Sequence, residues 1–170
     1  SDSTIDLLTQ QIEQMKQQLM KSEQKYSRFQ SIEMLDDAGN RTHLLKCGMP
    51  FSIILEIEIL KETDYLDLGL AITRHDGIQV SLSISSWEGL SKKFKKGACK
   101  LKADFPKIPF FRGNYTLSAW TKESTNHVND DSVQHALNFE IIDHNFNGNI
   151  FDFSAHTHAG SILKSSWCTC

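Results

Sequence analysis

The sequence lacks the motifs of the common catalytic classes. It contains no G-x-x-x-x-G-K-[ST], G-x-G-x-x-G, G-x-S-x-G or H-E-x-x-H. The chain therefore has no P-loop of its own with which to hydrolyse ATP. Glu56 and Glu58 lie two residues apart on one face of a predicted strand, whereas glycosidase carboxylates face each other across a substrate. We expect a protein without catalytic residues and without a cofactor.

Long apolar runs and a strong net charge are absent too. No stretch approaches the roughly 20 apolar residues that a membrane-spanning helix needs. The most apolar run, FSIILEIEIL at 51–60, is interrupted by Glu56 and Glu58. The net charge of −3 argues against a nucleic-acid binder, which needs a concentrated basic surface. The basic run KKFKK at 92–96 is more simply a solvated turn, so no nucleic-acid partner is predicted.

Cysteine is scarce and is not arranged as a structural zinc site. The C-x-x-C pairs of such sites are missing among the four cysteines, which are Cys47, Cys99, Cys168 and Cys170. A domain with this much apolar sequence does not need disulfides, so we expect reduced thiols.

The histidines offer one candidate metal pair. An extended chain would point His156 and His158 in the same direction. A further ligand, such as His144 or Asp152, would have to come from the fold. Ordinary surface and interface histidines are the simpler interpretation, and no metal is predicted.

Residues 4–30 have the period of a helix. Apolar side chains recur there at spacings of three and four, a heptad pattern formed by Ile5, Leu8, Ile12, Met15, Leu19, Ser22, Tyr26 and Phe29. β-Branched residues at one core position and leucine-like residues at the other favour two strands when the helices are parallel. We expect residues 1–30 to form a self-associating coiled-coil or linker segment. The alternative is a helix that packs along its own β domain.

From residue 31 the period changes to two. Alternating segments separated by turn signals predict strands near 31–36, 41–46, 52–60, 66–75, 78–87, 98–105, 113–122 and 134–143. Eight short strands without helical periods between them indicate a mainly β fold, an antiparallel β-sandwich. Tyr115, early in its strand after a glycine turn, is a candidate for a tyrosine corner.

The last segment, 144–170, is too apolar for a frayed chain end. It includes Phe146, Ile150, Phe151, Phe153, Ile162, Leu163 and Trp167. We expect it either to cover its own sandwich or to reach a neighbouring subunit. The predicted β domain therefore spans 31–170 and includes a C-terminal dimerisation tail.

One tryptophan falls on the wet face of a predicted strand. In RGNYTLSAWTK at 112–122, Tyr115, Leu117 and Ala119 face the core, and Trp120 alternates with them. Aromatic faces stack on the apolar faces of sugar rings, while neighbouring polar side chains bond hydroxyl groups. If its strands share a sheet, the outward set has that mixture: Asp67, Thr73, Thr116, Ser118, Trp120, His135, Asn138 and Glu140.

Trp87 is a second candidate for a sugar platform. It ends the strand predicted at 78–87, and its parity groups it with Ser81, Ser83 and Ser85. The alternative for both tryptophans is burial beneath the C-terminal tail or a dimer partner. The candidate carbohydrate-binding residues are Trp120, Ser118, Asn138, Glu140, His135, Asp67 and Trp87.

The order of several motifs is more specific than any one of them. The chain resembles the C-terminal domain of Wzt-type proteins, the nucleotide-binding subunits of ABC exporters for O-antigen polysaccharide. The resemblance covers about 31–167. It rests on Asp37 and Gly39; Gly48 to Ile57; Ile72, Arg74, Asp76 and Gly77; Gly113, Tyr115, Leu117 and Ser118; Phe139 and Ile141; and Gly160 to Trp167.

This resemblance implies an immunoglobulin-like sandwich that dimerises, often by exchanging its last strand. It implies a groove on one sheet for the non-reducing end of a finished glycan, with the transporter's ATPase and membrane subunits as further partners. It also implies a cytoplasmic place at the inner face of the bacterial inner membrane. The chain lacks the ATPase domain of such proteins, which suggests a fragment of one, and the helix before the sandwich could instead belong to a different parent.

Three functions remain open at this point. The first is a non-catalytic module that recognises a capped or modified O-polysaccharide terminus before export. The second is an adaptor, surface or phage structural protein whose coiled coil oligomerises a sandwich. The third is an enzyme or metal protein that uses the histidine-rich tail.

Overall fold

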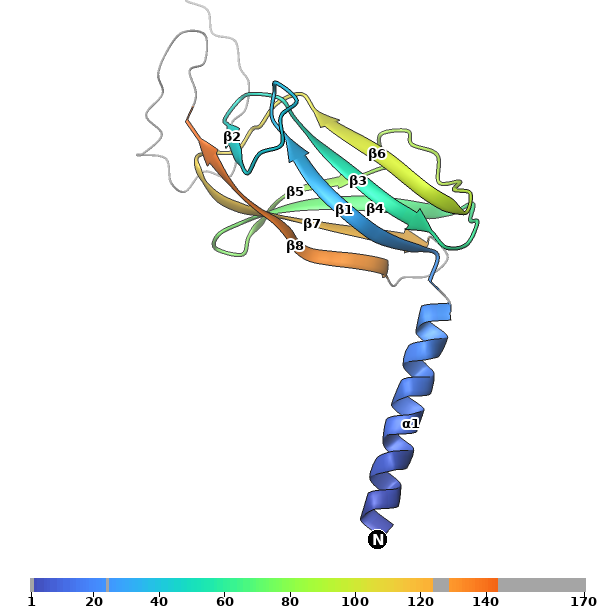
Figure 1. The fold of residues 1–170 in the computed structure, drawn as a ribbon. Helices are drawn as coiled ribbons and strands as arrows, with labels where there is room; N and C mark the ends of the chain where they lie inside the picture. Colours follow the sequence, from blue (N-terminus) through green and yellow to red (C-terminus); the bar gives the residue numbers. More distant parts are fainter. Residues whose placement is uncertain (1, 24, 124–128, 144–170) are drawn as a thin grey trace, which may run out of the picture.

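Two β-sheets pack face to face, and a helix extends away from one end of them (Figure 1). The computed structural model describes residues 2–23, 25–123 and 129–143. The predictions for the tail at 144–170, which include His156, His158 and Trp167, lie outside the described residues. The mainly β sandwich predicted from the alternating segments is confirmed.

The sheets contain three and five strands. The smaller has the order β1-β3-β6, and the larger has the order β2-β8-β7-β4-β5. The elements are α1 (Asp2–Glu23), β1 (Ser27–Leu35), β2 (Leu44–Lys46), β3 (Phe51–Ile59), β4 (Leu66–Arg74), β5 (Gln79–Ile84), β6 (Gly97–Phe105), β7 (Gly113–Glu123) and β8 (Asn129–Ile142).

Each predicted strand has a counterpart, but several differ from the prediction in bounds or direction. β1 begins at Ser27, four residues before its predicted start. β2 is three residues long and runs parallel to β8, although we expected an antiparallel strand over 41–46. β5 ends at Ile84 rather than at residue 87. β8 begins at Asn129, five residues before its predicted start, because its first residues pair with the end of β7.

The helix is shorter than its heptad pattern predicts. α1 ends at Glu23, and Tyr26 and Phe29 pack against the core of the sandwich instead of continuing the seam. Phe29 belongs to β1, where it lies opposite Ile57 of β3. Burial against the sheet therefore overrides the helical spacing of these two aromatic residues.

The remaining apolar seam of α1 faces solvent. Every residue from 3 to 20 is exposed, and Figure 1 shows the helix directed away from the sheets. The alternative that this helix packs along its own β domain is therefore wrong. Self-association through the seam stays a prediction, and its exposed apolar side chains include Ile5, Leu8, Ile12, Met15 and Leu19.

The inner faces of both sheets form one apolar core. Alternate residues of β3, β4, β7 and β8 are buried between the layers: Ile53, Leu55, Ile57, Ile59, Leu66, Leu68, Leu70, Ile72, Tyr115, Leu117, Ala119, Phe139 and Ile141. The Tyr115 hydroxyl donates a hydrogen bond of 2.8 Å to the Phe111 carbonyl, four residues upstream. This is the geometry of the predicted tyrosine corner.

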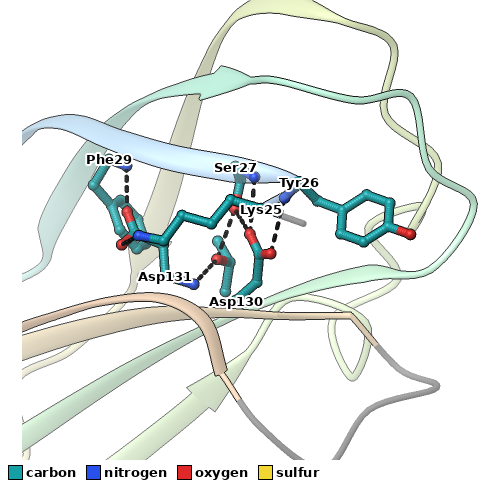
Figure 2. Close-up of polar contacts among 7 residues, drawn as sticks. Lys25, Tyr26, Ser27, Phe29, Asp130 and Asp131 are labelled. Carbon is teal, nitrogen blue, oxygen red and sulfur yellow. Dashed lines mark hydrogen bonds and ion pairs between the residues drawn. The ribbon is translucent and has the colours of Figure 1, made fainter. Parts of the chain in front are cut away.

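Two neighbouring aspartates join the root of the helix to the large sheet (Figure 2). Asp130 accepts hydrogen bonds of 2.8 Å from the backbone amides of both Tyr26 and Ser27. Asp131 accepts a bond of 2.9 Å from the backbone amide of Phe29. We call these two carboxylates and the three amides the aspartate clasp, and it connects the start of β1 to the start of β8 across the two layers.

A buried hydroxyl chain completes the clasp. The Asp131 amide donates to the Thr121 hydroxyl at 3.0 Å, and the Thr121 and Ser27 hydroxyls lie 2.7 Å apart. Ser27 in turn donates to Asp130 at 2.6 Å. Ser27 and Thr121 have no exposed surface, so each buried hydroxyl is satisfied within this chain of bonds. Lys25 adds an ion pair of 3.0 Å to Asp131.

Replacing one clasp carboxylate tests its contribution to stability. Asp130 accepts bonds from Tyr26 and Ser27 through both of its carboxylate oxygens, and Asp130→Asn replaces one of these oxygens with an NH₂ group that cannot accept. A buried donor that loses its acceptor is costly. We expect the free energy of unfolding in urea to fall by about 1–3 kcal/mol. The control is Asp104→Asn, whose carboxylate makes its contacts with Ser52 and Lys102 at the exposed surface, so this change should lower stability much less than Asp130→Asn. Equal losses in the two variants would contradict the assigned role.

Candidate functional site

The outer face of the five-stranded sheet gathers most of the predicted recognition residues. β7 runs between β4 and β8, and its register sets Trp120 opposite Gly69 on β4 and Ser132 on β8. Four residues further back on the same face, Thr116 lies opposite Asn138. Ser118 lies between Thr116 and Trp120 in the alternation of β7.

The Trp120 indole lies over the backbone of Gly69. A Cβ atom built on Gly69 would stand 2.1 Å from Cε2 and 2.6 Å from Nε1 of Trp120, so the ring fills the space that a side chain would occupy. Covering a strand glycine with a cross-strand aromatic ring protects its backbone and keeps the ring close to the sheet. Trp120 is half-buried in this position. The outcome lies between the two expectations, an exposed platform and a buried residue.

A bulge in β8 brings His135 onto the same face. The register shifts between Leu117 and Ala119 of β7, and His135 takes a positive φ of 51°. Its backbone amide donates to the Ser118 hydroxyl at 3.0 Å, and its Nδ1 lies 3.2 Å from the Thr116 hydroxyl. Bulges and left-handed backbone commonly redirect side chains at functional sites. Here the bulge joins three of the outward polar residues into one cluster.

A pocket of about 400 Å³ opens beside this cluster at the far end of the face, and we call it the β7–β8 pocket. Tyr115 and Phe139 contribute apolar surface to it, and the polar residues of its lining are His43, His75, Asn114, Thr116, Asn138 and Glu140. Two opposed pairs form the floor, Asn114 with Glu140 and Thr116 with Asn138. His43 precedes β2 on the β8 side, and His75 follows β4 on the β7 side.

Backbone and ring contacts hold the two histidines in place. His43 Nδ1 lies 3.1 Å from the Asn138 carbonyl, and the His43 carbonyl accepts a bond of 2.9 Å from the Glu140 amide. The His75 amide donates to the Asn114 carbonyl at 3.0 Å. Within the described ranges, the side chains of Asn114, Asn138 and Glu140 make no hydrogen bond of their own. The pocket therefore presents free donors and acceptors.

Asp67 is already committed to structural contacts. Its carboxylate accepts hydrogen bonds from the Ser85 hydroxyl at 2.8 Å and the Ser86 hydroxyl at 2.6 Å, and Lys92 lies 3.5 Å away. Burial works to raise the pKa of Asp67, but the hydrogen bonds from Ser86 and Ser85 and the charge of Lys92 outweigh it, so its pKa lies below the usual value. Asp67 thus fixes the segment that follows β5.

The prediction of which β5 side chains face outward is wrong. Ser83 lies opposite the buried Leu70, so it faces the interior and lines a hollow of about 690 Å³ between the open edges of the sheets. Leu82 and Ile84 take the outer face instead. Trp87 follows the end of β5 in a turn and is 70 % exposed, so it does not share the outer face through strand alternation.

Catalytic and metal chemistry find little support in the part of the chain that the structure describes. There, no group of three or more histidine, cysteine or acidic residues is placed to hold a metal ion. The thiol of Cys47 is buried, and burial raises its pKa to about 11, so it is a poor nucleophile. Among the described residues, no helix combines the length and the apolar character that crossing a membrane requires.

The fold is a β-sandwich with a group of polar residues on the outer face of its five-stranded sheet. The family model of the Wzt C-terminal domain matches residues 21–153. The chain belongs to this family, and the predicted resemblance is confirmed. At the level of the family, the domain binds carbohydrate in O-antigen export by an ABC transporter and is non-catalytic. A search of curated proteins gave no match.

A solved structure from this family supports the fold. The crystal structure of the C-terminal domain of Wzt has a TM-score of 0.63 at 17 % identity, covering 86 % of this chain and 89 % of that one. A Pseudomonas fluorescens alkylpurine DNA glycosylase, AlkC, bound to DNA with an abasic-site analogue, has a TM-score of 0.45 at 10 % identity, covering 70 % of this chain and 31 % of that one. The second likeness carries no argument about this protein.

Filling the space above Gly69 should displace the indole. Gly69→Ala introduces a Cβ atom where the Trp120 ring now lies, and the ring must leave the sheet to avoid it. We expect the fluorescence emission of Trp120 to shift to longer wavelength as its exposure to water increases, while the circular dichroism spectrum keeps its β character. A Trp87→Phe background removes the emission of one exposed tryptophan. An unchanged spectrum would contradict the close contact.

The role assigned to Asp67 predicts a stability change that depends on pH. Since its folded pKa is lowered, the carboxylate stabilises the fold above its ordinary pKa of about 4 and loses this effect as the pH falls further. Asp67→Asn should cost about 1 kcal/mol at pH 7 in urea unfolding, and the difference from wild type should narrow below pH 4. A difference that is constant with pH would contradict this role.

Proposed function

We propose that this chain is a non-catalytic carbohydrate-binding module that recognises the non-reducing, capped or modified end of an O-antigen polysaccharide for ABC-transporter export. The observation that carries the proposal is the indole of Trp120 held over Gly69 on the outer face of the five-stranded sheet. Family membership supplies the class of ligand, and this face supplies groups of the right chemistry for it.

The Trp120 ring and its polar neighbours perform different parts of recognition. A half-buried indole offers a rigid apolar surface on which one face of a sugar ring can stack with little loss of side-chain entropy. Asn138 and Glu140 offer the planar amide and carboxylate groups that pair with hydroxyls. Ser118 and His135 belong to the cluster that lies between Trp120 and this polar pair. Asp67 and Trp87 do not contact the glycan in this proposal, because they belong to the β5 side of the sheet.

The same proposal includes partners beyond the glycan. The exposed seam of α1 supports a homodimer formed through a parallel pair of helices, with the C-terminal tail as a second contact. The aspartate clasp would then hold each glycan face in a fixed relation to the helix root. The ATPase and membrane subunits of the transporter would be joined through the parent protein, at the inner face of the inner membrane.

The exposed seam also favours a second candidate, an adaptor in which the coiled coil oligomerises a protein-binding sandwich. The two candidates differ in one property, because an adaptor of this kind has no affinity for glycans. Direct binding measurements therefore separate them.

Removing the platform should weaken glycan binding selectively. The chain is screened on an array of bacterial O-polysaccharides, and affinity for the polysaccharide that binds is then measured by calorimetry. We expect Trp120→Ala to weaken binding at least about tenfold, and Trp120→Phe, which keeps a smaller ring, to weaken it less. Trp87→Ala is the matched control and should bind like wild type. Equal effects of Trp120→Ala and Trp87→Ala would contradict the placement of the site, and a wild-type chain that binds no polysaccharide would favour the adaptor.

A further inference from the structure

We infer that the β7–β8 pocket is a second subsite of the glycan face, so that the ligand is an extended oligosaccharide that contacts Trp120 and the pocket at once. The inference rests on the proposed function and goes beyond it in two respects. It sets the length of the ligand, and it assigns the pocket a preference for an uncharged or amino-bearing sugar unit.

The length follows from strand geometry. Thr116, the pocket residue of β7 nearest to Trp120, is four positions away from it. At about 3.4 Å per residue, their Cα atoms are roughly 14 Å apart along the strand. One sugar ring is far too short to span this distance. A ligand that touches both must be a chain of several sugars laid along β7.

The exposed imidazole of His135 lies between the two parts. Its Nδ1 lies 3.2 Å from the hydroxyl of Thr116, which itself lines the pocket. Ser118 is only 7 % exposed and accepts the His135 amide, so it supports the bulge and offers no surface to a ligand. A glycan chain that leaves the indole therefore passes the His135 imidazole and the Thr116 hydroxyl as it enters the pocket.

The two parts make different kinds of contact. Trp120 supplies apolar area, which favours many sugars alike. The pocket supplies an amide from each of two strands, a carboxylate and two imidazoles, and His43 and Asn138 are fixed relative to each other by the bond of 3.1 Å from Nδ1 to the carbonyl. Hydrogen bonds of fixed direction discriminate between sugars because a mismatched hydroxyl leaves a polar group unpaired. The pocket is thus the part of the face that selects the sugar.

The charge of the lining sets the chemical class of that sugar. Glu140 is the carboxylate of the pocket, and neither lysine nor arginine contributes to the lining. An anionic sugar unit placed there would meet a like charge, which is unfavourable, whereas a hydroxyl or an amino group would find an acceptor. The pocket accordingly favours neutral or amino-bearing units over phosphorylated or carboxylated ones.

A series of fragments tests the length. Oligosaccharides of one sugar upward are prepared from the polysaccharide that binds on the array, and each is titrated into the 170-residue chain. Affinity should rise with length until the fragment spans both parts. Asn138→Ala should weaken the longest fragment about three- to tenfold and leave fragments too short to reach the pocket unchanged. Full affinity for a single sugar, or an unaffected long fragment, would overturn the inference while leaving the proposed function intact.

A charge-matched pair of variants tests the selectivity. Glu140→Gln keeps the size of the side chain but removes its charge, and Glu56→Gln makes the same change on the outer side of the other sheet. The probes are one oligosaccharide with and without a phosphate or carboxylate on its last sugar. We expect Glu140→Gln to reduce the discrimination against the anionic form at least about threefold, and Glu56→Gln to leave it unchanged. Equal discrimination in the two variants would overturn the charge preference. Wild-type protein that binds none of the glycans would instead overturn the proposed function itself.

Discussion

The burial of one side of β7 is the constraint from which the arrangement of the recognition face follows. Tyr115, Leu117 and Ala119 are buried between the sheets, and the strand is paired along both edges, with β4 and β8. A slip of one residue would expose these three side chains and push Trp120 into the core, so the register is strongly fixed. The outward position of Trp120 is therefore a consequence of the core.

This constraint links the core, the site and the helix. With β7 fixed, the register to β4 leaves Gly69 beneath the Trp120 indole, and the register to β8 creates the bulge that presents His135. The next residue of β7, Thr121, is buried and takes part in the hydroxyl chain of the aspartate clasp. The candidate glycan platform and the root of α1 thus depend on adjacent residues of one strand.

Local patterns predict the strands well and the edges poorly. Alternation identifies the buried faces of β3, β4 and β7 because each strand is buried on one side over many residues. Periodicity fails at Tyr26 and Phe29, because their spacing fits a helical heptad although both side chains pack against the core of the sandwich. It also fails at Ser83, where the parity depends on how an edge strand pairs. The contact of Trp120 with Gly69, and the approach of His43 through a parallel β2–β8 pair, join residues far apart in the sequence, so no local pattern contains them.

The central claim, that the outer face of the five-stranded sheet binds glycan, is tested most directly by NMR. The ¹⁵N-labelled chain is titrated with an O-polysaccharide that it binds, and the amide and indole shifts are mapped onto the fold. We expect the indole N–H of Trp120 and the amides of β7 and β8 to shift most, and the amides of β1, β3 and β6 to stay nearly unchanged. Shifts concentrated on the β1-β3-β6 sheet or on α1 would contradict this claim.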